Sequence, residues 1–279
     1  MISLKARAKI NIGLKILNKR EDGYHDIETT MTTINLSDLI DIKEIESGIT
    51  MKSRGLDVPL KENLCYRAAE IFKREFKITK GIDINLVKNI PVGGGLGGGS
   101  SDAATILKGM NELFNQKASD ETLMELGKEL GSDVSFFIKG GAAYARGKGD
   151  ELKFFKLPRM SFVIYYPGYA VSTKWAYQEY DKIMLTPQPN TDNIIINKGK
   201  KGKKRRVSFN LENSFENVVF KKHPDLLDIK ANLVAAGAFF ISLSGSGSCL
   251  FALLDASVRT KIIGYLEGIG AQYFEVRTI

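Results

Sequence analysis

Cysteine and histidine are scarce in this sequence, with two residues of each among 279. Cys65 and Cys249 lie far apart in apolar segments, which favours buried, reduced thiols over a disulfide or a redox pair. His25 and His223 have no cysteine or histidine at the spacings that hold zinc. We therefore expect no metal site built from protein side chains alone.

Long apolar runs are also missing. No stretch of about 18 apolar residues occurs, which excludes a membrane-spanning helix of the usual length. Residues 1–7 lack the charged-then-apolar layout of a signal peptide, so we expect a cytoplasmic protein. Hydrophobic residues make up 43% of the chain and charged residues 26%, as in ordinary soluble proteins. The length favours two domains over one.

A general excess of basic residues is absent too, although the net charge is +8. Seven basic residues lie in one short stretch, and removing them leaves a charge of only +1: Lys198, Lys200, Lys201, Lys203, Lys204, Arg205 and Arg206. The rest of the chain therefore has no broad polyanion-binding field, and we expect no nucleic-acid partner. We interpret the stretch as an exposed hairpin or loop; an RNA-binding protein that uses it is the remote alternative.

Hydrophobic periodicity predicts strands that come in groups, which favours an α+β fold over strict alternation. The expected strands are 2–17, further strands within 24–45, 82–87, 140–146, 151–155, 162–166, a strand-loop-strand over 239–254, and 272–277. The expected helices are 63–76, 101–114, 119–130, 173–183, 211–220, 224–236 and 256–269. A linker at 157–160 suggests one domain over 1–156 and a second over 157–279.

A glycine-rich run joins the strand at 82–87 to the helix expected from Ser101. It contains six glycines in seven residues and reads Pro91, Val92, Gly93, Gly94, Gly95, Leu96, Gly97, Gly98, Gly99, Ser100, Ser101. Glycine lets backbone N–H groups converge on a ligand, and a helix start attracts phosphate. The two serines can cap the helix and donate to phosphate. The run lacks the lysine of a Walker A loop; a flexible linker is the alternative.

This run resembles the second motif of the GHMP kinase family, which includes homoserine and mevalonate kinases. Residues 8–14 are similar to the family's first motif, 22–25 to a substrate loop and 244–248 to the third motif. The resemblance implies ATP with Mg²⁺ as cofactors and a small-molecule alcohol as substrate. It implies a ribosomal-protein-like N-terminal domain, a ferredoxin-like C-terminal domain and an active site in the crevice between them, in a monomer or weak homodimer.

Lys9 and Asp133 are the candidate catalytic pair. Local pattern alone leaves Asp133 open as a helix cap or a functional acid, and Lys9 as an outward-facing strand residue or a functional cation. By resemblance, Asp133 matches the catalytic aspartate and Lys9 the lysine beside it. A lysine there would keep the carboxylate ionised for proton transfer from an alcohol.

The acceptor pocket is expected around Tyr24 and His25, because an aromatic ring next to an imidazole can bind a planar base. A surface loop without a binding role fits the same pattern. The resemblance implies that this loop reads the cytosine of a cytidine diphosphate group on the alcohol; homoserine and mevalonate types are the alternatives. Further substrate contacts are expected from Asn11, Lys148, Thr173, Tyr177, Gly245 and Gly247. Asn63 and Lys88 are expected on the adenosine side of ATP.

Overall fold

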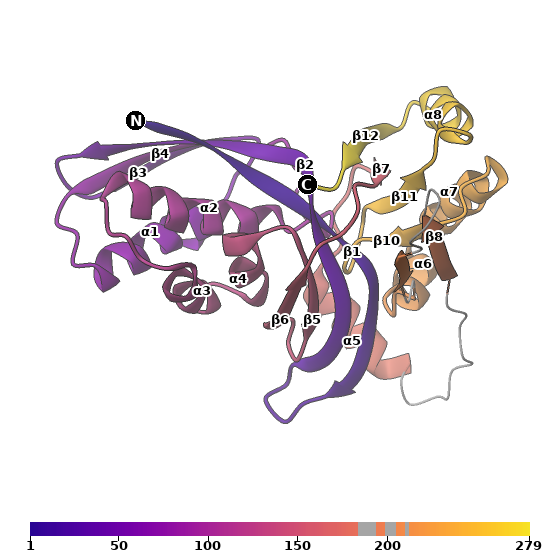
Figure 1. Ribbon diagram of the computed structural model, residues 1–279, viewed down its shortest axis with the longest axis horizontal. Coiled ribbons are helices and arrows are strands. Elements are labelled where there is room, and N and C mark those ends of the chain that lie inside the picture. The colour runs from indigo at the N-terminus through magenta and orange to yellow at the C-terminus, as the bar shows by residue number, and fades with distance from the viewer. Residues whose placement is uncertain (184–193, 199–204, 210–211) are drawn as a thin grey trace.

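Two antiparallel strands of unusual length organise the fold, β1 (Ile2–Lys19) and β2 (His25–Ile45). The computed structural model describes residues 1–183, 194–198, 205–209 and 212–279. Figure 1 shows this hairpin running from the N-terminal half of the molecule into the C-terminal half. The sequence predicted several strands over 24–45, but they form one strand, because β1 pairs with it from His25 to Ile42 and a further strand, 81–87, pairs with it up to Ile45.

The N-terminal half is a mixed sheet covered by helices on one face (Figure 1). β1 pairs with β2, and the strand order is β3 (Ile49–Arg54), β4 (Gly81–Val87), β2, β5 (Ala142–Arg146), β6 (Glu151–Phe155), with only β3 and β4 parallel. The helices are η1 (Leu60–Glu62), α1 (Leu64–Glu75), α2 (Gly98–Leu113), α3 (Asp120–Lys128) and α4 (Ser132–Lys139). Strand β3 was not predicted from the sequence, and helix α4 was indicated only by the interpretation of Asp133 as a possible helix cap.

The C-terminal half is a four-stranded antiparallel sheet in the order β10 (Ile241–Leu243), β11 (Leu250–Leu254), β7 (Ser161–Tyr166), β12 (Gln272–Arg277). Its helices are α5 (Thr173–Ile183), α6 (Glu216–Lys222), α7 (Pro224–Ala235) and α8 (Arg259–Gly268). The first strand of this half lies between the third and the last, which is the ferredoxin-like arrangement expected. The two halves have the α+β character predicted from grouped strands.

Three consecutive stretches of β1 belong to three different hydrophobic clusters. Ala6 packs under the helices of the N-terminal sheet. Ile10 packs with Phe162 and Phe251 of the C-terminal sheet. Ile16 packs with residues of α5 and α6. The hairpin therefore joins the two halves, and the space beside it is bounded by both.

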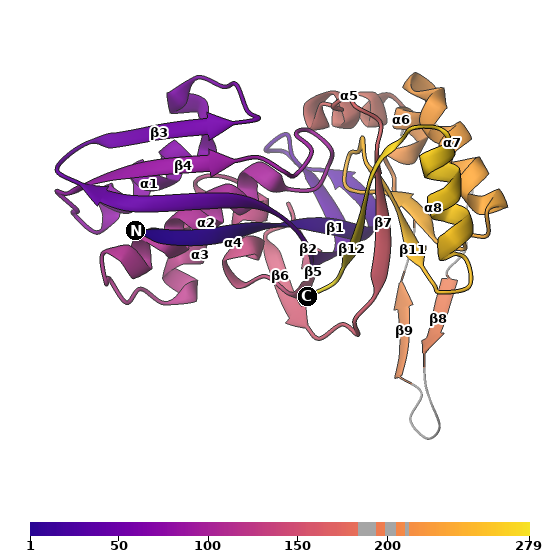
Figure 2. The same cartoon turned by 90° about the horizontal axis from the view of Figure 1, so that it is seen from above.

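Three residues of the basic stretch, Lys198, Arg205 and Arg206, lie in the paired antiparallel strands β8 (Ile194–Lys198) and β9 (Arg205–Phe209), which project from the C-terminal half in Figure 2. The pairing agrees with the predicted hairpin. Lys200, Lys201, Lys203 and Lys204 lie outside the described residues, as does Leu211, the predicted start of the helix that begins at Glu216.

Candidate active site

A cavity of about 960 Å³ lies between the two halves, alongside the hairpin. Most of the predicted site residues line it: Lys9, Asn11, Tyr24, His25, Lys88, residues 91–100, Asp133, Lys148, Thr173, Tyr177 and Gly245. Asn63, Ser101 and Gly247 are not among the lining residues. Segments more than 200 residues apart in the sequence thus meet in one space.

The first part of the glycine run is held by the C-terminal half. The carbonyl of Gly94 accepts from the N–H of Cys249 at 3.1 Å, and that of Gly93 from the N–H of Val171 at 3.2 Å. The hydroxyl of Ser244 donates to the carbonyl of Gly95 at 2.9 Å. The glycine run, which is the second predicted motif, thus contacts the third motif, residues 244–248, through Ser244.

Gly95 shows why this segment needs glycine. Its φ is +76°, and a Cβ built on it would lie 1.9 Å from the carbonyl oxygen of Ser244. Both the left-handed backbone and the close approach exclude a side chain. The run is therefore a packed interdomain segment, which rules out the flexible-linker alternative.

Helix α2 begins at Gly98, three residues earlier than predicted. Its N-cap is Gly97 in the left-handed conformation, with no side-chain cap, so the capping role predicted for Ser100 and Ser101 is wrong. Both serines lie in the first helical turns because the glycines before them continue the helix. Ser100 lines the cavity, whereas Ser101 is buried. Free N–H groups of this helix start remain suited to an anion.

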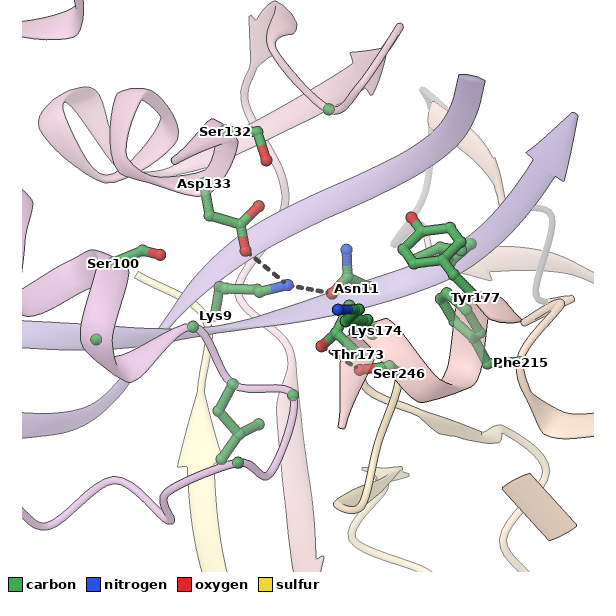
Figure 3. A pocket seen from close by; sticks show the side chains of 18 of the residues that line it. Lys9, Asn11, Ser100, Ser132, Asp133, Thr173, Lys174, Tyr177, Phe215 and Ser246 are labelled. Atoms are coloured by element: carbon green, nitrogen blue, oxygen red, sulfur yellow. Dashed lines mark hydrogen bonds and ion pairs between the residues drawn. The ribbon is translucent and has the colours of Figure 1, made fainter. Parts of the chain in front are cut away.

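Lys9 lies at the centre of a chain of polar contacts (Figure 3). Its ammonium is 3.3 Å from a carboxylate oxygen of Asp133 and donates to Oδ1 of Asn11 at 2.5 Å. The amide of Asn11 donates to Thr29 at 3.0 Å, and the Thr29 hydroxyl donates to the carbonyl of Gly13 at 2.6 Å. Each donor in this series has an acceptor, so the orientation of the Asn11 amide is fixed.

The structure excludes the structural alternative that the local pattern left open for each residue of this pair, and their catalytic roles stay predictions. Lys9 is only 5% exposed, so it is not an outward-facing strand residue. The neighbours Ala8 and Ile10 point to the opposite side of the strand and pack against the C-terminal sheet. Asp133 lies in the first turn of α4, whose N-cap is Gly131, so it is not the cap. Its carboxylate is available at the cavity.

The loop between β10 and β11 approaches Lys9 and Asn11. A Cβ on Gly245 would lie 3.3 Å from Oδ1 of Asn11 and 3.7 Å from Nζ of Lys9, and its φ is +57°. Asn213 holds this loop by donating to the carbonyls of Leu243 and Gly245 at 2.9 and 2.8 Å. The loop is therefore more than a tight turn, because its backbone forms a wall of the cavity.

Aromatic side chains form the far end of the cavity. The rings of His25 and Tyr177 stack with centroids 4.7 Å apart and planes 17° apart. Burial and the nearby charge of Asp133 raise the pKa of Tyr177 to about 12, so its hydroxyl stays neutral near neutral pH. Tyr24 is 61% exposed, with the ammonium of Lys148 4.9 Å above its ring. Thr173 contacts the hydroxyl of Ser246 at 2.8 Å.

Lys88 is buried beneath the glycine run between two carboxylates. Its ammonium lies 2.5 Å from Asp38 and 2.7 Å from Asp102. Burial alone would lower the pKa of Lys88, but these two charges raise it above its usual value. Asn63 caps α1 by accepting from the N–H of Cys65 at 2.9 Å. The adenosine contacts of Lys88 and Asn63 stay predictions.

Ser246 lies within the third motif, 244–248, but was not predicted as a site residue. The residues of the site missed altogether in the sequence are Thr29, Asp38, Asp102, Asp181 and Asn213. Asp181 carries one signal that could have revealed it, since it follows Tyr177 by four positions and Thr173 by eight on one helix. The others contact partners distant in the sequence, and no local pattern marks them. In the part of the chain that the structure describes, no three His, Cys, Asp or Glu side chains gather into a metal site.

No helix among the described residues is long and apolar enough to span a bilayer. Both cysteines are free and buried, as expected, and burial raises the pKa of the Cys249 thiol.

The chain was compared with known families and proteins. Residues 63–141 match the family "GHMP kinases N terminal domain", and residues 201–268 match "GHMP kinases C terminal". The 4-diphosphocytidyl-2-C-methyl-D-erythritol kinase of Clostridium beijerinckii is 43% identical over 265 residues, covering 94% of each chain. The enzyme of that name from Bacillus cereus is 40% identical, covering 99% of this chain and 96% of the other.

Solved structures agree with the sequence comparison. A crystal structure of 4-(cytidine 5'-diphospho)-2C-methyl-D-erythritol kinase has a TM-score of 0.78 and 29% identity, with 99% of each chain covered. The mevalonate kinase of Methanococcus jannaschii has a TM-score of 0.68 at 17% identity, covering 100% of this chain and 98% of that one. The second likeness concerns the fold alone.

Proposed function

This chain belongs to the GHMP kinase family and is a phosphotransferase, and on that premise we propose that it phosphorylates 4-diphosphocytidyl-2-C-methyl-D-erythritol with ATP. The acceptor is the 2-hydroxyl, and the reaction belongs to isoprenoid precursor biosynthesis. Relatives that bear the name of this kinase match the chain at about 40% identity over nearly their full length.

One observation carries the proposal. The Lys9–Asp133 pair lies in a single cavity with the glycine run on one side and the His25–Tyr177 stack on the other. A helix start preceded by glycines suits the phosphates of ATP, and stacked rings suit a pyrimidine base. The reacting hydroxyl would then lie between them, beside the catalytic pair.

The chemistry follows from this order. The acceptor oxygen forms a bond to the γ-phosphorus of ATP while the bond from that phosphorus to the β–γ bridging oxygen breaks, which releases ADP. Asp133 takes the proton of the hydroxyl, a role that requires an ionised carboxylate. Lys9, whose ammonium lies 3.3 Å from the Asp133 carboxylate, offsets negative charge on the acceptor oxygen. Asn11 fixes the direction of the ammonium.

Magnesium belongs to the proposal because the ion neutralises charge on the phosphates of ATP. Mg²⁺ prefers oxygen ligands and is commonly held by one or two protein groups together with substrate phosphates and water. The Asp133 carboxylate and the Ser100 hydroxyl both line the cavity and fit such a set.

The substitution Asp133→Asn tests the catalytic assignment. We expect kcat to fall by about 10²–10⁴-fold, the range for loss of a general base, with the dissociation constants for ATP and CDP within a few fold of wild type. Asp120→Asn is the matched control, because Asp120 also lies in the first turn of a helix but is exposed and outside the cavity. Turnover of Asp133→Asn near that of wild type would refute the assignment.

A further inference from the structure

We propose that Asp181 is a positioning residue of the acceptor site, whose carboxylate joins α5 to the β1–β2 hairpin and holds the His25 ring in place for a pyrimidine base. The inference rests on the proposed function, since the base belongs to the cytidine diphosphate group of that acceptor.

Two short contacts define the role of Asp181. Its Oδ1 lies 2.6 Å from Nε2 of His25, and its Oδ2 accepts from the ammonium of Lys19 at 2.6 Å. Lys19 and His25 are partners across the hairpin, so one carboxylate holds both strands where they turn. The His25 side chain is only 6% exposed, and a buried ring nitrogen needs such a partner.

Helix α5 presents Asp181 on its cavity side. Thr173, Tyr177 and Asp181 are spaced by four residues, so they lie along one face of the helix, and all three line the cavity. Figure 3 shows Thr173 and Tyr177 on this helix, and both line the same cavity as Asn11. The helix thus meets His25 twice, through the ring of Tyr177 and through the carboxylate of Asp181.

The charge state of Asp181 decides which His25 nitrogen carries hydrogen. Burial would raise the pKa of Asp181, but the contacts with Lys19 and His25 lower it below the usual value. The group is therefore a carboxylate near neutral pH, and a carboxylate can only accept. Nε2 of His25 must be the donor, and Nδ1, for which the described part of the chain shows no partner, is left as the ring nitrogen that can contact a ligand.

Steady-state kinetics of Asp181→Asn test this role. Loss of a charge-assisted hydrogen bond loosens the ring without touching the phosphates. We expect KM for the cytidine-linked acceptor to rise about tenfold or more, with kcat and KM for ATP within about twofold of wild type. The control is Glu179→Gln, since Glu179 is on the same helix and pairs with Lys182 at 2.7 Å but does not line the cavity. An unchanged acceptor KM, or a loss confined to kcat, overturns the proposal.

A measurement on the wild-type protein keeps the inference testable if the variant does not fold. The chain has two histidines, so a ¹⁵N–¹H correlation spectrum of the imidazoles contains two spin systems, and His223→Gln identifies the one from His25. We expect hydrogen on Nε2 of His25 at neutral pH. A neutral ring with hydrogen on Nδ1 alone contradicts the inference.

The two proposals fail in different ways. If wild-type protein neither binds CDP nor phosphorylates the acceptor, the proposed function is wrong. If the wild type does both and Asp181→Asn matches it in acceptor KM, only the positioning role is wrong.

Discussion

At the scale of single residues, the glycine run contains glycines with different physical reasons for their presence. A Cβ on Gly95 would lie 1.9 Å from the carbonyl oxygen of Ser244, at a φ of +76°. A Cβ on Gly99 would meet its nearest neighbour, Leu64, at an ordinary 3.5 Å. The composition of the run alone does not separate these two cases, because a phosphate cradle and a tight interdomain contact both favour glycine.

The pair Gly95→Ala and Gly99→Ala tests this distinction. We expect Gly95→Ala to lose about 3 kcal/mol or more of unfolding free energy, from overpacking and backbone strain together. Gly99→Ala should lie within about 1 kcal/mol of wild type, because alanine is the better residue inside a helix. Urea denaturation monitored by circular dichroism measures both. Equal stability of the two variants would contradict the packing argument.

The buried group of Lys88, Asp38 and Asp102 holds one positive charge between two acidic groups. Asp38 also accepts from the N–H groups of Asn89 and Ile90 at 2.6 and 2.8 Å. No hydrogen-bond partner for Oδ1 of Asp102 is found within the described residues. Burial and the charge of Asp38, only partly offset by Lys88, raise the pKa of Asp102 to about 7.

This raised pKa predicts a pH dependence of stability. Between the usual pKa of an aspartate and about 7, the folded chain holds a proton on Asp102 that the unfolded chain has released. Unfolding therefore becomes harder as pH falls through this window and easier as pH rises through 7. Relative to Asp102→Asn, we expect wild type to gain about 1 kcal/mol of unfolding free energy between pH 8 and pH 6. Urea denaturation at both pH values measures this gain, and a difference that does not change with pH would refute it.

At the scale of elements, the proximity of Lys9 and Asp133 was expected from resemblance, whereas the local pattern alone left the role of each residue open. Lys9 interrupts an apolar strand, and Asp133 lies among small and apolar residues. The boundaries of the helices were harder to predict from the sequence. Helix α2 was expected from Ser101, yet it begins at Gly98, where a Cβ would lie 3.1 Å from both Ile90 and Lys88. Local helix propensity does not reveal tertiary contacts of this kind.

Asn213 was invisible in the sequence because its partners lie 30 and 32 residues further along the chain. Its side chain donates to two carbonyls of the β10–β11 loop and accepts from the N–H of Phe215 at 2.9 Å. The residue is 4% exposed. It therefore sets the position of the loop whose Gly245 lies against Asn11 and Lys9.

Asn213→Asp tests this element-scale role. The carboxylate keeps the size of the side chain and can still accept from Phe215, but it cannot donate to the two carbonyls. We expect a loss of about 2 kcal/mol or more of unfolding free energy, from buried carbonyls without partners, together with a lower kcat. Asn213→Ala, which removes all three contacts, is the comparison variant. If Asn213→Asp is as stable and active as wild type, the loop is positioned by other contacts.

At the scale of the whole molecule, the site exists because one hairpin passes from one half to the other. The first half supplies Lys9, Asp133 and the glycine run, and the second supplies Tyr177 and the loop at Gly245. The two-domain α+β architecture was predictable from grouped strands and from resemblance. The first strand of the hairpin was predicted close to its observed bounds, but the continuity of β2 was not, because its pairing with β1 shifts register near Lys9 and Leu14.

The central claim is that ATP and a cytidine-linked alcohol meet at the Lys9–Asp133 pair. The direct test incubates wild-type protein with ATP, Mg²⁺ and 4-diphosphocytidyl-2-C-methyl-D-erythritol, with homoserine and mevalonate in parallel, and follows the products by ³¹P NMR. Carbon 2 of the acceptor carries a methyl group and no hydrogen. We predict one new phosphomonoester signal without three-bond coupling to hydrogen, formed only with the cytidine-linked acceptor. A coupled signal, or faster phosphorylation of homoserine or mevalonate, would contradict the account.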